Sequence, residues 1–90
     1  MEVQLTIKNP EGLHARPAGM LAKKAAQFQS NIQISVSGQL KSAKSIMGLM
    51  SLSLKKDQEF TLIIDGPDAE AARDALSALV NSEFKSESTV

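Results

Sequence analysis

The 90-residue chain contains no cysteine, no tryptophan, no tyrosine and a single histidine. Without cysteine it can form no disulfide, thiol nucleophile or cysteine metal site, and one histidine leaves a zinc site with poor options. No stretch approaches the roughly 18 consecutive apolar residues of a membrane helix, and the N-terminus lacks the basic-then-apolar order of a signal peptide. We therefore expect a cytoplasmic protein with no metal, no cofactor and no membrane insertion.

The chain length suits one compact domain spanning residues 1–90, with too little core to enclose a deep substrate cavity. Chemistry is therefore expected at the surface. The residues after 82 are polar, so the segment 83–90 is expected to fray, apart from a docking of Phe84 on the domain.

Charge is balanced overall but unevenly distributed. Residues 1–56 carry eight basic side chains against two glutamates, a net charge of +6, and residues 57–90 carry two against eight, a net charge of −6. Either the two halves intermix their charges in space, or a basic face steers acidic protein partners. Nucleic acid is not expected as a partner, because no Trp or Tyr can stack on bases and no dense basic run is present.

Hydrophobic periodicity predicts seven elements in the order β-α-β-β-α-β-α. Apolar and polar residues alternate in the strand segments, whereas the helical segments repeat apolar residues every three or four positions. The predicted strands span 3–7, 32–36, 40–43 and 60–64, and the predicted helices span 16–28, 46–52 and 69–80. Four strands that need one covered face, with helices that each offer one apolar face, indicate an α+β two-layer sandwich with an antiparallel sheet.

The only histidine stands where a turn passes into the first helix. The turn Asn9-Pro10-Glu11-Gly12 precedes Leu13-His14-Ala15-Arg16-Pro17-Ala18. The first N–H groups of a helix lack intrahelical partners and favour an anion such as phosphate. A neutral imidazole is a nucleophile near neutral pH, and a nearby guanidinium can bind phosphoryl oxygens. These features predict that His14 can be phosphorylated. A lone histidine at a helix start can also be structural or merely exposed.

A second helix entrance carries a serine. Ser45 precedes the apolar run 46–52, and Lys44 stands beside it. A phosphoryl group on a serine at this position would face free helix N–H groups. The alternative is that Ser45 only caps the helix, a role worth about 1 kcal/mol.

Three methionines are candidates for a partner-docking patch beside His14. Met20 lies off the predicted buried stripe of its helix, and the run containing Met47 and Met50 is too apolar to point entirely inward. Flexible thioethers suit a surface that adapts to several partners, although methionines also fill gaps in cores. We expect Lys23 and Lys24 to add basic charge to this docking surface.

The strings Gly12–Ala18 and Lys44–Leu52 resemble the two signatures of the HPr family, the histidine phosphocarriers of the phosphoenolpyruvate-dependent sugar phosphotransferase system. The resemblance implies an open-faced β-sandwich with sheet order 1-4-2-3 and three helices on one face. His14 would accept phosphate on Nδ1 from the phosphorylated first enzyme and pass it to sugar-specific acceptor proteins. The residues expected to support the phosphate are Ala15, Arg16, Pro17, Ala18 and Lys44.

The same resemblance implies a carrier without turnover of its own, and a monomer is expected. In some bacteria the family's serine, here Ser45, is the target of an HPr kinase/phosphorylase and links the protein to a transcriptional regulator of carbon use. A mainly regulatory paralogue of carbon or nitrogen control is therefore the alternative function. The carbon-control paralogue has its histidine replaced, so the retained His14 favours the carrier.

Overall fold

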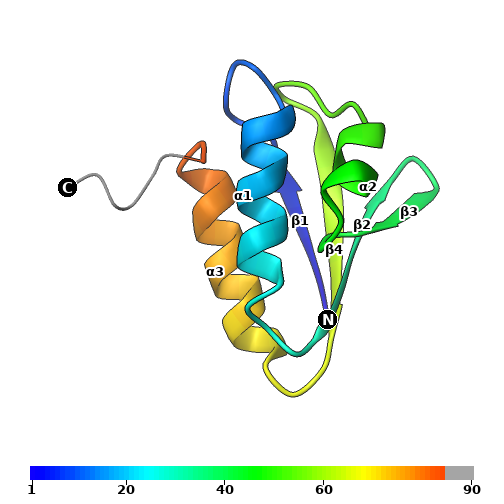
Figure 1. The fold of residues 1–90 in the computed structure, drawn as a ribbon, viewed down its shortest axis with the longest axis vertical. Helices are drawn as coiled ribbons and strands as arrows, with labels where there is room; N and C mark the ends of the chain where they lie inside the picture. Colours follow the sequence, from blue (N-terminus) through cyan, green and yellow to red (C-terminus); the bar gives the residue numbers. More distant parts are fainter. Residues whose placement is uncertain (85–90) are drawn as a thin grey trace.

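The computed structural model describes residues 1–84 and has the predicted order of elements (Figure 1). The elements are β1 (Glu2–Thr6), α1 (Ala15–Ala25), β2 (Asn31–Val36), β3 (Gln39–Ser42), α2 (Ile46–Ser51), β4 (Glu59–Asp65) and α3 (Ala69–Asn81). The strands form one antiparallel sheet in the order β1-β4-β2-β3. The expected α+β open-faced sandwich is confirmed.

Strand β4 pairs with β1 on one side and with β2 on the other, and its register shows which side chains lie on each face of the sheet. Leu62 pairs with Val3 of β1 and with Ile34 of β2, so one row of side chains faces the helices. The next row, from Thr61 to its partners on either side, faces away. Because side chains alternate along a strand, this register puts most apolar side chains on the helix side, with Ile63 of β4 and Leu40 of β3 as exceptions on the open face.

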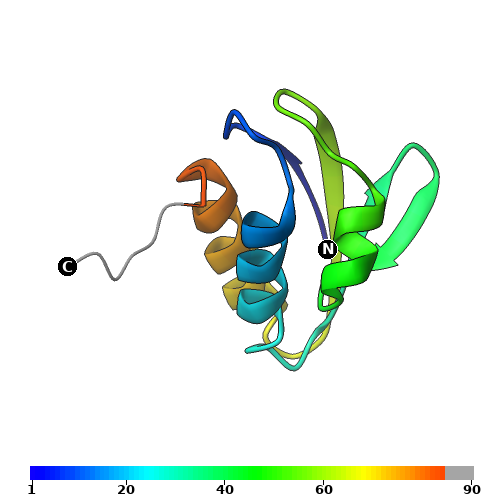
Figure 2. The ribbon, with the colours of Figure 1, turned by 45° about the horizontal axis from the view of Figure 1, so that its top comes forward.

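All three helices lie on the apolar face of the sheet (Figures 1 and 2). Helix α1 packs between α2 and α3. Helices α1 and α3 bury most of the stripe that their sequences predict, whereas α2 buries only Leu49. The largest fully buried apolar side chains come from strands, helices and loops alike: Ile7, Leu21, Ile32, Ile34, Leu49, Leu62, Ile64, Leu76, Val80 and Phe84. Burying a side chain of this size contributes about 1.5–3 kcal/mol each, which makes this single core the main source of stability.

The element boundaries differ from the predicted ones by no more than three residues. Helix α1 ends at Ala25 rather than at Phe28, because the amides of Gln27 and Phe28 bond to carbonyls only three residues back. The shorter i→i−3 spacing closes the helix with a tight last turn. Phe28 still packs against the core.

The chain folds back after α3. The amide of Phe84 donates to the carbonyl of Leu79 at 3.0 Å, and its side chain is fully buried. The predicted docking of Phe84 is confirmed. The rest of the expected frayed tail, residues 85–90, lies outside the described residues.

Asp68 joins two loops at the end of the molecule opposite His14. It occupies the N-cap position of α3, and its carboxylate accepts hydrogen bonds from the amides of Gln29 and Ser30 and from the hydroxyl of Ser30. These bonds, above all the one from the Ser30 hydroxyl, lower the pKa of Asp68 below its usual value. The side chain makes no capping bond to α3, because two loops from different parts of the chain meet at this carboxylate.

The Asp68 contact predicts a specific acid sensitivity. Because the carboxyl has a lower pKa when folded than when unfolded, its stabilisation is complete above the usual pKa of about 3.9 and is lost as pH falls through the lowered value. Asp68→Asn is expected to reduce the melting temperature at pH 7 and to melt with the wild type near pH 2. Thermal unfolding at pH 7, 4 and 2 tests this, with Asp74→Asn on the same helix as control. A gap between wild type and Asp68→Asn that persists at pH 2 would contradict the assignment.

Candidate functional site

His14 occupies the N-cap position of α1. Its backbone is extended, and its carbonyl accepts the first helical bond from the amide of Ala18 at 2.9 Å. Its side chain makes no capping bond and is exposed. Proline at position 17 lacks an N–H, so the free donors of the first turn are the amides of Ala15 and Arg16. The imidazole therefore projects into solvent at the positive end of a helix dipole.

The turn before His14 is pressed tightly against the loop that follows α2. The amide of Gly12 donates to the carbonyl of Asn9 at 3.1 Å, and the amide of Leu13 donates to the carbonyl of Leu54 at 2.9 Å. Gly12 has a φ of +74°, and a Cβ there would lie 2.5 Å from the Leu54 oxygen. Only glycine combines this conformation with this close approach.

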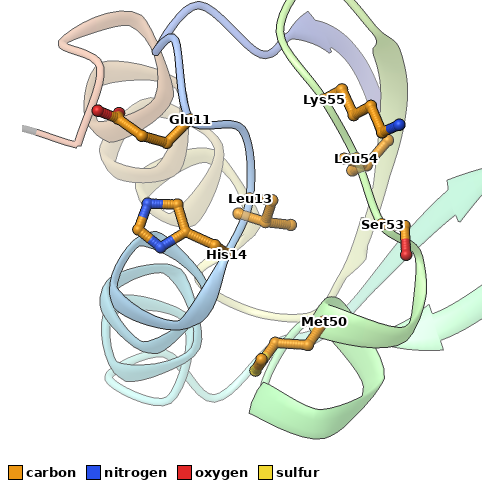
Figure 3. A pocket seen from close by; sticks show the side chains of 7 residues that line it. All are labelled: Glu11, Leu13, His14, Met50, Ser53, Leu54 and Lys55. Carbon is orange, nitrogen blue, oxygen red and sulfur yellow. The ribbon is translucent and has the colours of Figure 1, made fainter.

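A shallow pocket of about 300 Å³ opens beside the imidazole (Figure 3). We call it the His14 pocket; its lining residues are Glu11, Leu13, His14, Met50, Ser53, Leu54 and Lys55. Figure 3 shows Glu11 and His14 on the same side of their loop, and Met50 extending from α2 below them. Met50 was expected near His14 from the sequence, whereas the contribution of residues 53–55 was not expected. No local pattern announces that contribution, because it depends on how two distant loops meet.

The Arg16 guanidinium makes no hydrogen bond to His14 in this structure. Its Nη1 donates to the sulfur of Met20 at 3.3 Å and to the carbonyl of Phe84 at 3.5 Å. The guanidinium is thus turned toward the end of α3. Since Arg16 is exposed and the carbonyl contact is longer than a usual hydrogen bond, rotation toward an anion at His14 costs little.

The other residues expected to support phosphate contribute unequally. Ala15 is exposed and its amide is a first-turn donor, whereas Pro17 and Ala18 are buried in the helix packing. The amide of Ala18 is already bonded to the His14 carbonyl, so it is not available to a phosphate. Pro17 and Ala18 hold the helix start in place but offer no donor.

At the second helix entrance, Ser45 caps α2. Its hydroxyl accepts from the amide of Gly48 at 3.0 Å, as expected of an N-cap serine. The Lys44 ammonium makes no hydrogen bond to Ser45. It donates to the carbonyl of Phe28 at 2.9 Å. It therefore binds the loop that follows α1.

The candidate docking residues do not form one uniform patch. Met47 is 81% exposed and Met50 is 42% exposed, and both belong to α2. Met20 is half-buried and packs against the core. Lys23 and Lys24 lie in the last turn of α1, which at 1.5 Å per residue is roughly 14 Å along the helix from His14.

Charge pairing within the domain is sparse. Arg73 and Asp74 form an ion pair at 3.0 Å, both in the acidic half of the sequence. Among residues 1–84, no basic side chain of the first 56 residues pairs with a carboxylate.

The described part of the chain has neither a candidate metal-binding cluster nor a candidate membrane-spanning helix. Residues 1–84 contain no cluster of three or more His, Asp or Glu side chains that could hold a metal ion. None of the helices in this range is both long and apolar enough to cross a membrane.

Comparison with known proteins identifies the family. A family model described as "PTS HPr component phosphorylation site" matches residues 1–82. The chain belongs to the HPr family. Phosphocarrier protein HPr of Lysinibacillus sphaericus is 42% identical over 77 residues, which cover 86% of this chain and 88% of that one. The HPr-like protein Crh of Halalkalibacterium halodurans is also 42% identical, over 92% of this chain and 99% of the relative.

Structures and longer relatives agree with this family. The crystal structure of HPr-C-His from Thermoanaerobacter tengcongensis superposes with a TM-score of 0.91 at 41% identity, covering 97% of this chain and 98% of that one. The Multiphosphoryl transfer protein of Vibrio cholerae is 44% identical over 84% of this chain, but the chain spans only 20% of that protein's length. The HPr family thus includes both separate small proteins and parts of larger ones.

Proposed function

We propose that the chain is a phosphocarrier in which His14 accepts a phosphoryl group from the phosphorylated first enzyme of the phosphoenolpyruvate-dependent sugar phosphotransferase system. It then passes the group to sugar-specific acceptor proteins. The observation that carries the proposal is the exposed imidazole at the N-terminus of α1, inside the segment that matches the family model. The open pocket beside it leaves room for the phosphorylated group of a partner protein.

The transfer itself requires only one nucleophile and an anion site. The lone pair of neutral His14 Nδ1 attacks phosphorus, and the N–P bond forms as the bond to the donor breaks, with the electron pair left on the donor. The amides of Ala15 and Arg16 and the helix dipole stabilise the bound phosphoryl oxygens. The Arg16 guanidinium joins them after leaving Met20 and the Phe84 carbonyl.

The protein alone completes no catalytic cycle under this proposal. His14 returns to its starting state only when an acceptor protein takes the phosphoryl group, so turnover belongs to the chain of partners. The surface position of the site suits a monomer in the cytoplasm that meets donor and acceptors in turn. Size-exclusion chromatography at micromolar concentration tests the monomer.

A labelling experiment tests the carrier function. The purified protein is incubated with the first enzyme and labelled phosphoenolpyruvate, and the bound label is then exposed to acid and to alkali. We expect label that is lost in acid and retained in alkali, as for a phosphohistidine. Absence of any label with an active first enzyme would overturn the proposal. Exchanging acceptor proteins between sugar and nitrogen-control systems in the same assay distinguishes the paralogues.

Exposed methionines on α2 are proposed as the centre of the docking surface, with Met20, Lys23 and Lys24 on the neighbouring helix. Met47→Glu is expected to weaken binding of the first enzyme at least tenfold while leaving the melting temperature nearly unchanged, because the side chain is 81% exposed. Isothermal titration with the first enzyme and thermal unfolding measure both effects. Leu40→Glu is the control, since Leu40 is also an exposed apolar residue but lies on edge strand β3.

The outcome for Met47 separates docking from packing. A large loss of stability in Met47→Glu would assign the side chain to the core, and equal weakening by Leu40→Glu would show a nonspecific effect of charge. Met20→Glu would not separate docking from packing, because Met20 packs against the core and contacts Arg16.

A regulatory function through Ser45 is the second candidate, and the 42% identity to an HPr-like protein Crh favours considering it. Under this proposal an ATP-dependent HPr kinase/phosphorylase modifies Ser45 and the product binds a transcriptional regulator. Incubation with ATP and such a kinase is expected to give acid-stable label that Ser45→Ala lacks. Since that variant also loses the cap bond to Gly48, worth about 1 kcal/mol, its fold is verified by thermal unfolding first.

A further inference from the structure

A buried amide lies beneath the turn that leads to His14. Asn9 is only 4% exposed, which is unusual for an asparagine next to a proline on a surface turn. Its Nδ2 donates to the carbonyl of Gly12 at 2.7 Å, and the amide of Gly12 donates back to the carbonyl of Asn9. The side chain and backbone of Asn9 thus close the four-residue turn twice.

The peptide unit between Gly12 and Leu13 is held from both sides. Its carbonyl accepts from Asn9 Nδ2, and its N–H donates to the carbonyl of Leu54 at 2.9 Å. The next side chain, Leu13, is buried, so the backbone can rotate little between this unit and His14. A short chain of fixed groups therefore connects the Asn9 amide to the start of α1.

The oxygen of the Asn9 side-chain amide indicates that asparagine is required at this position for its N–H donor. Asn9 Oδ1 is buried and has no hydrogen-bond partner among the described residues. A buried acceptor without a partner costs about 1–3 kcal/mol. An aliphatic residue would avoid this cost but could not hold the Gly12 carbonyl. An unsatisfied polar atom needs an explanation, and the hydrogen bond from Nδ2 to the Gly12 carbonyl supplies one.

We propose that Asn9 is a positioning residue for phosphoryl transfer, which holds the His14 imidazole at the N-terminus of α1 by fixing the Gly12–Leu13 peptide. The inference rests on the proposed carrier function. Asn9 is buried under the turn, so it acts on the orientation of the nucleophile rather than on partner binding. Since transfer depends on the angle and distance of attack, loosening the turn lowers the rate of the chemical step.

Asn9→Asp is the sharpest variant, because it keeps the shape of the side chain and replaces the donor with an acceptor. Asn9→Ala serves as a second variant if the aspartate prevents folding. Ser30→Ala is the matched control: Ser30 is another buried polar residue whose side-chain bond joins two loops, but it lies at the far end of α1. All proteins are assayed at least 15 °C below their melting temperatures.

Steady-state phosphorylation by the first enzyme provides the main readout. We expect the Asn9 variant to lower kcat about tenfold with KM unchanged, less than the roughly 100-fold that a 1 Å misplacement can cost. Ser30→Ala is expected to leave both constants unchanged. Wild-type kcat in the Asn9 variant, a change in KM alone, or an equal loss in Ser30→Ala would each overturn the inference.

A second readout is independent of activity. In nuclear magnetic resonance spectra, the amide signals of Leu13 and His14 and the His14 ring signals are expected to shift and broaden in the Asn9 variant but not in Ser30→Ala. If the wild type takes up no phosphate, the carrier function has failed and these spectra alone decide whether Asn9 orders the turn. Unchanged spectra would refute the positioning role.

Discussion

Replacing His14 with alanine is expected to abolish phosphoryl uptake from the first enzyme without unfolding the protein. The imidazole is exposed and makes no capping bond, so its loss removes no packing and is expected to change stability by less than about 0.5 kcal/mol. Among the residues lining the His14 pocket, only this side chain can form a phosphohistidine. The acid-labile label is therefore expected to fall below detection, and thermal unfolding confirms the fold.

Arg16→Ala makes the matched comparison for His14→Ala. Its guanidinium assists the anion but forms no bond to phosphorus, so this variant is expected to retain label and to acquire it more slowly. Removing one donor aimed at a developing charge commonly costs about 100-fold in rate. Persistent acid-labile label in His14→Ala would place the reactive group elsewhere and contradict the assignment of the site.

Gly12→Ala is expected to destabilise the protein by about 3 kcal/mol. An L-residue at a φ of +74° costs about 1–2 kcal/mol, and a Cβ 2.5 Å from the Leu54 carbonyl oxygen forces the two loops apart at a further cost of about 1–3 kcal/mol. This is a large part of the about 5–15 kcal/mol by which a domain is stable. Urea unfolding measures the difference.

Gly38 provides the control for Gly12. It has a similar φ of +84° in the turn between β2 and β3, and a Cβ there would meet nothing within 4 Å. Gly38→Ala should therefore lose only the conformational part, about 1–2 kcal/mol. Equal losses in the two variants would show that the contact between the turn and Leu54 contributes little.

Local pattern predicts this fold well because each element follows one simple rule. Alternation placed the apolar rows of β1, β2 and β4 on one face of the sheet, and the helical spacing in α1 and α3 marked their buried stripes. Errors are confined to the ends of elements, where capping and tight turns compete with periodicity. The sheet order came from the resemblance to a family and not from the pattern.

The sequence-based predictions were least accurate for the hydrogen-bond partners of long side chains. Arg16 was expected beside His14, but its guanidinium donates to the carbonyl of Phe84. Lys44 was expected beside Ser45, but its ammonium donates to the carbonyl of Phe28. Long cations bond to whatever acceptor the packing brings near, and adjacency in sequence does not decide this. Asp68 is the N-cap residue of α3, but its carboxylate likewise accepts from Gln29 and Ser30 of another loop and not from the helix.

His14 at the start of a helix was determined by the sequence alone, because a turn, a proline and an apolar period fix where α1 begins. The sequence likewise determined Ser45 as a cap and the α+β layering, which are local or periodic properties. Only the tertiary structure decided that residues 53–55 border the imidazole, that Met47 is open while Met20 is packed, and that a buried Asn9 supports the turn. These depend on contacts between segments far apart in the chain, which form only when the core brings the loops together.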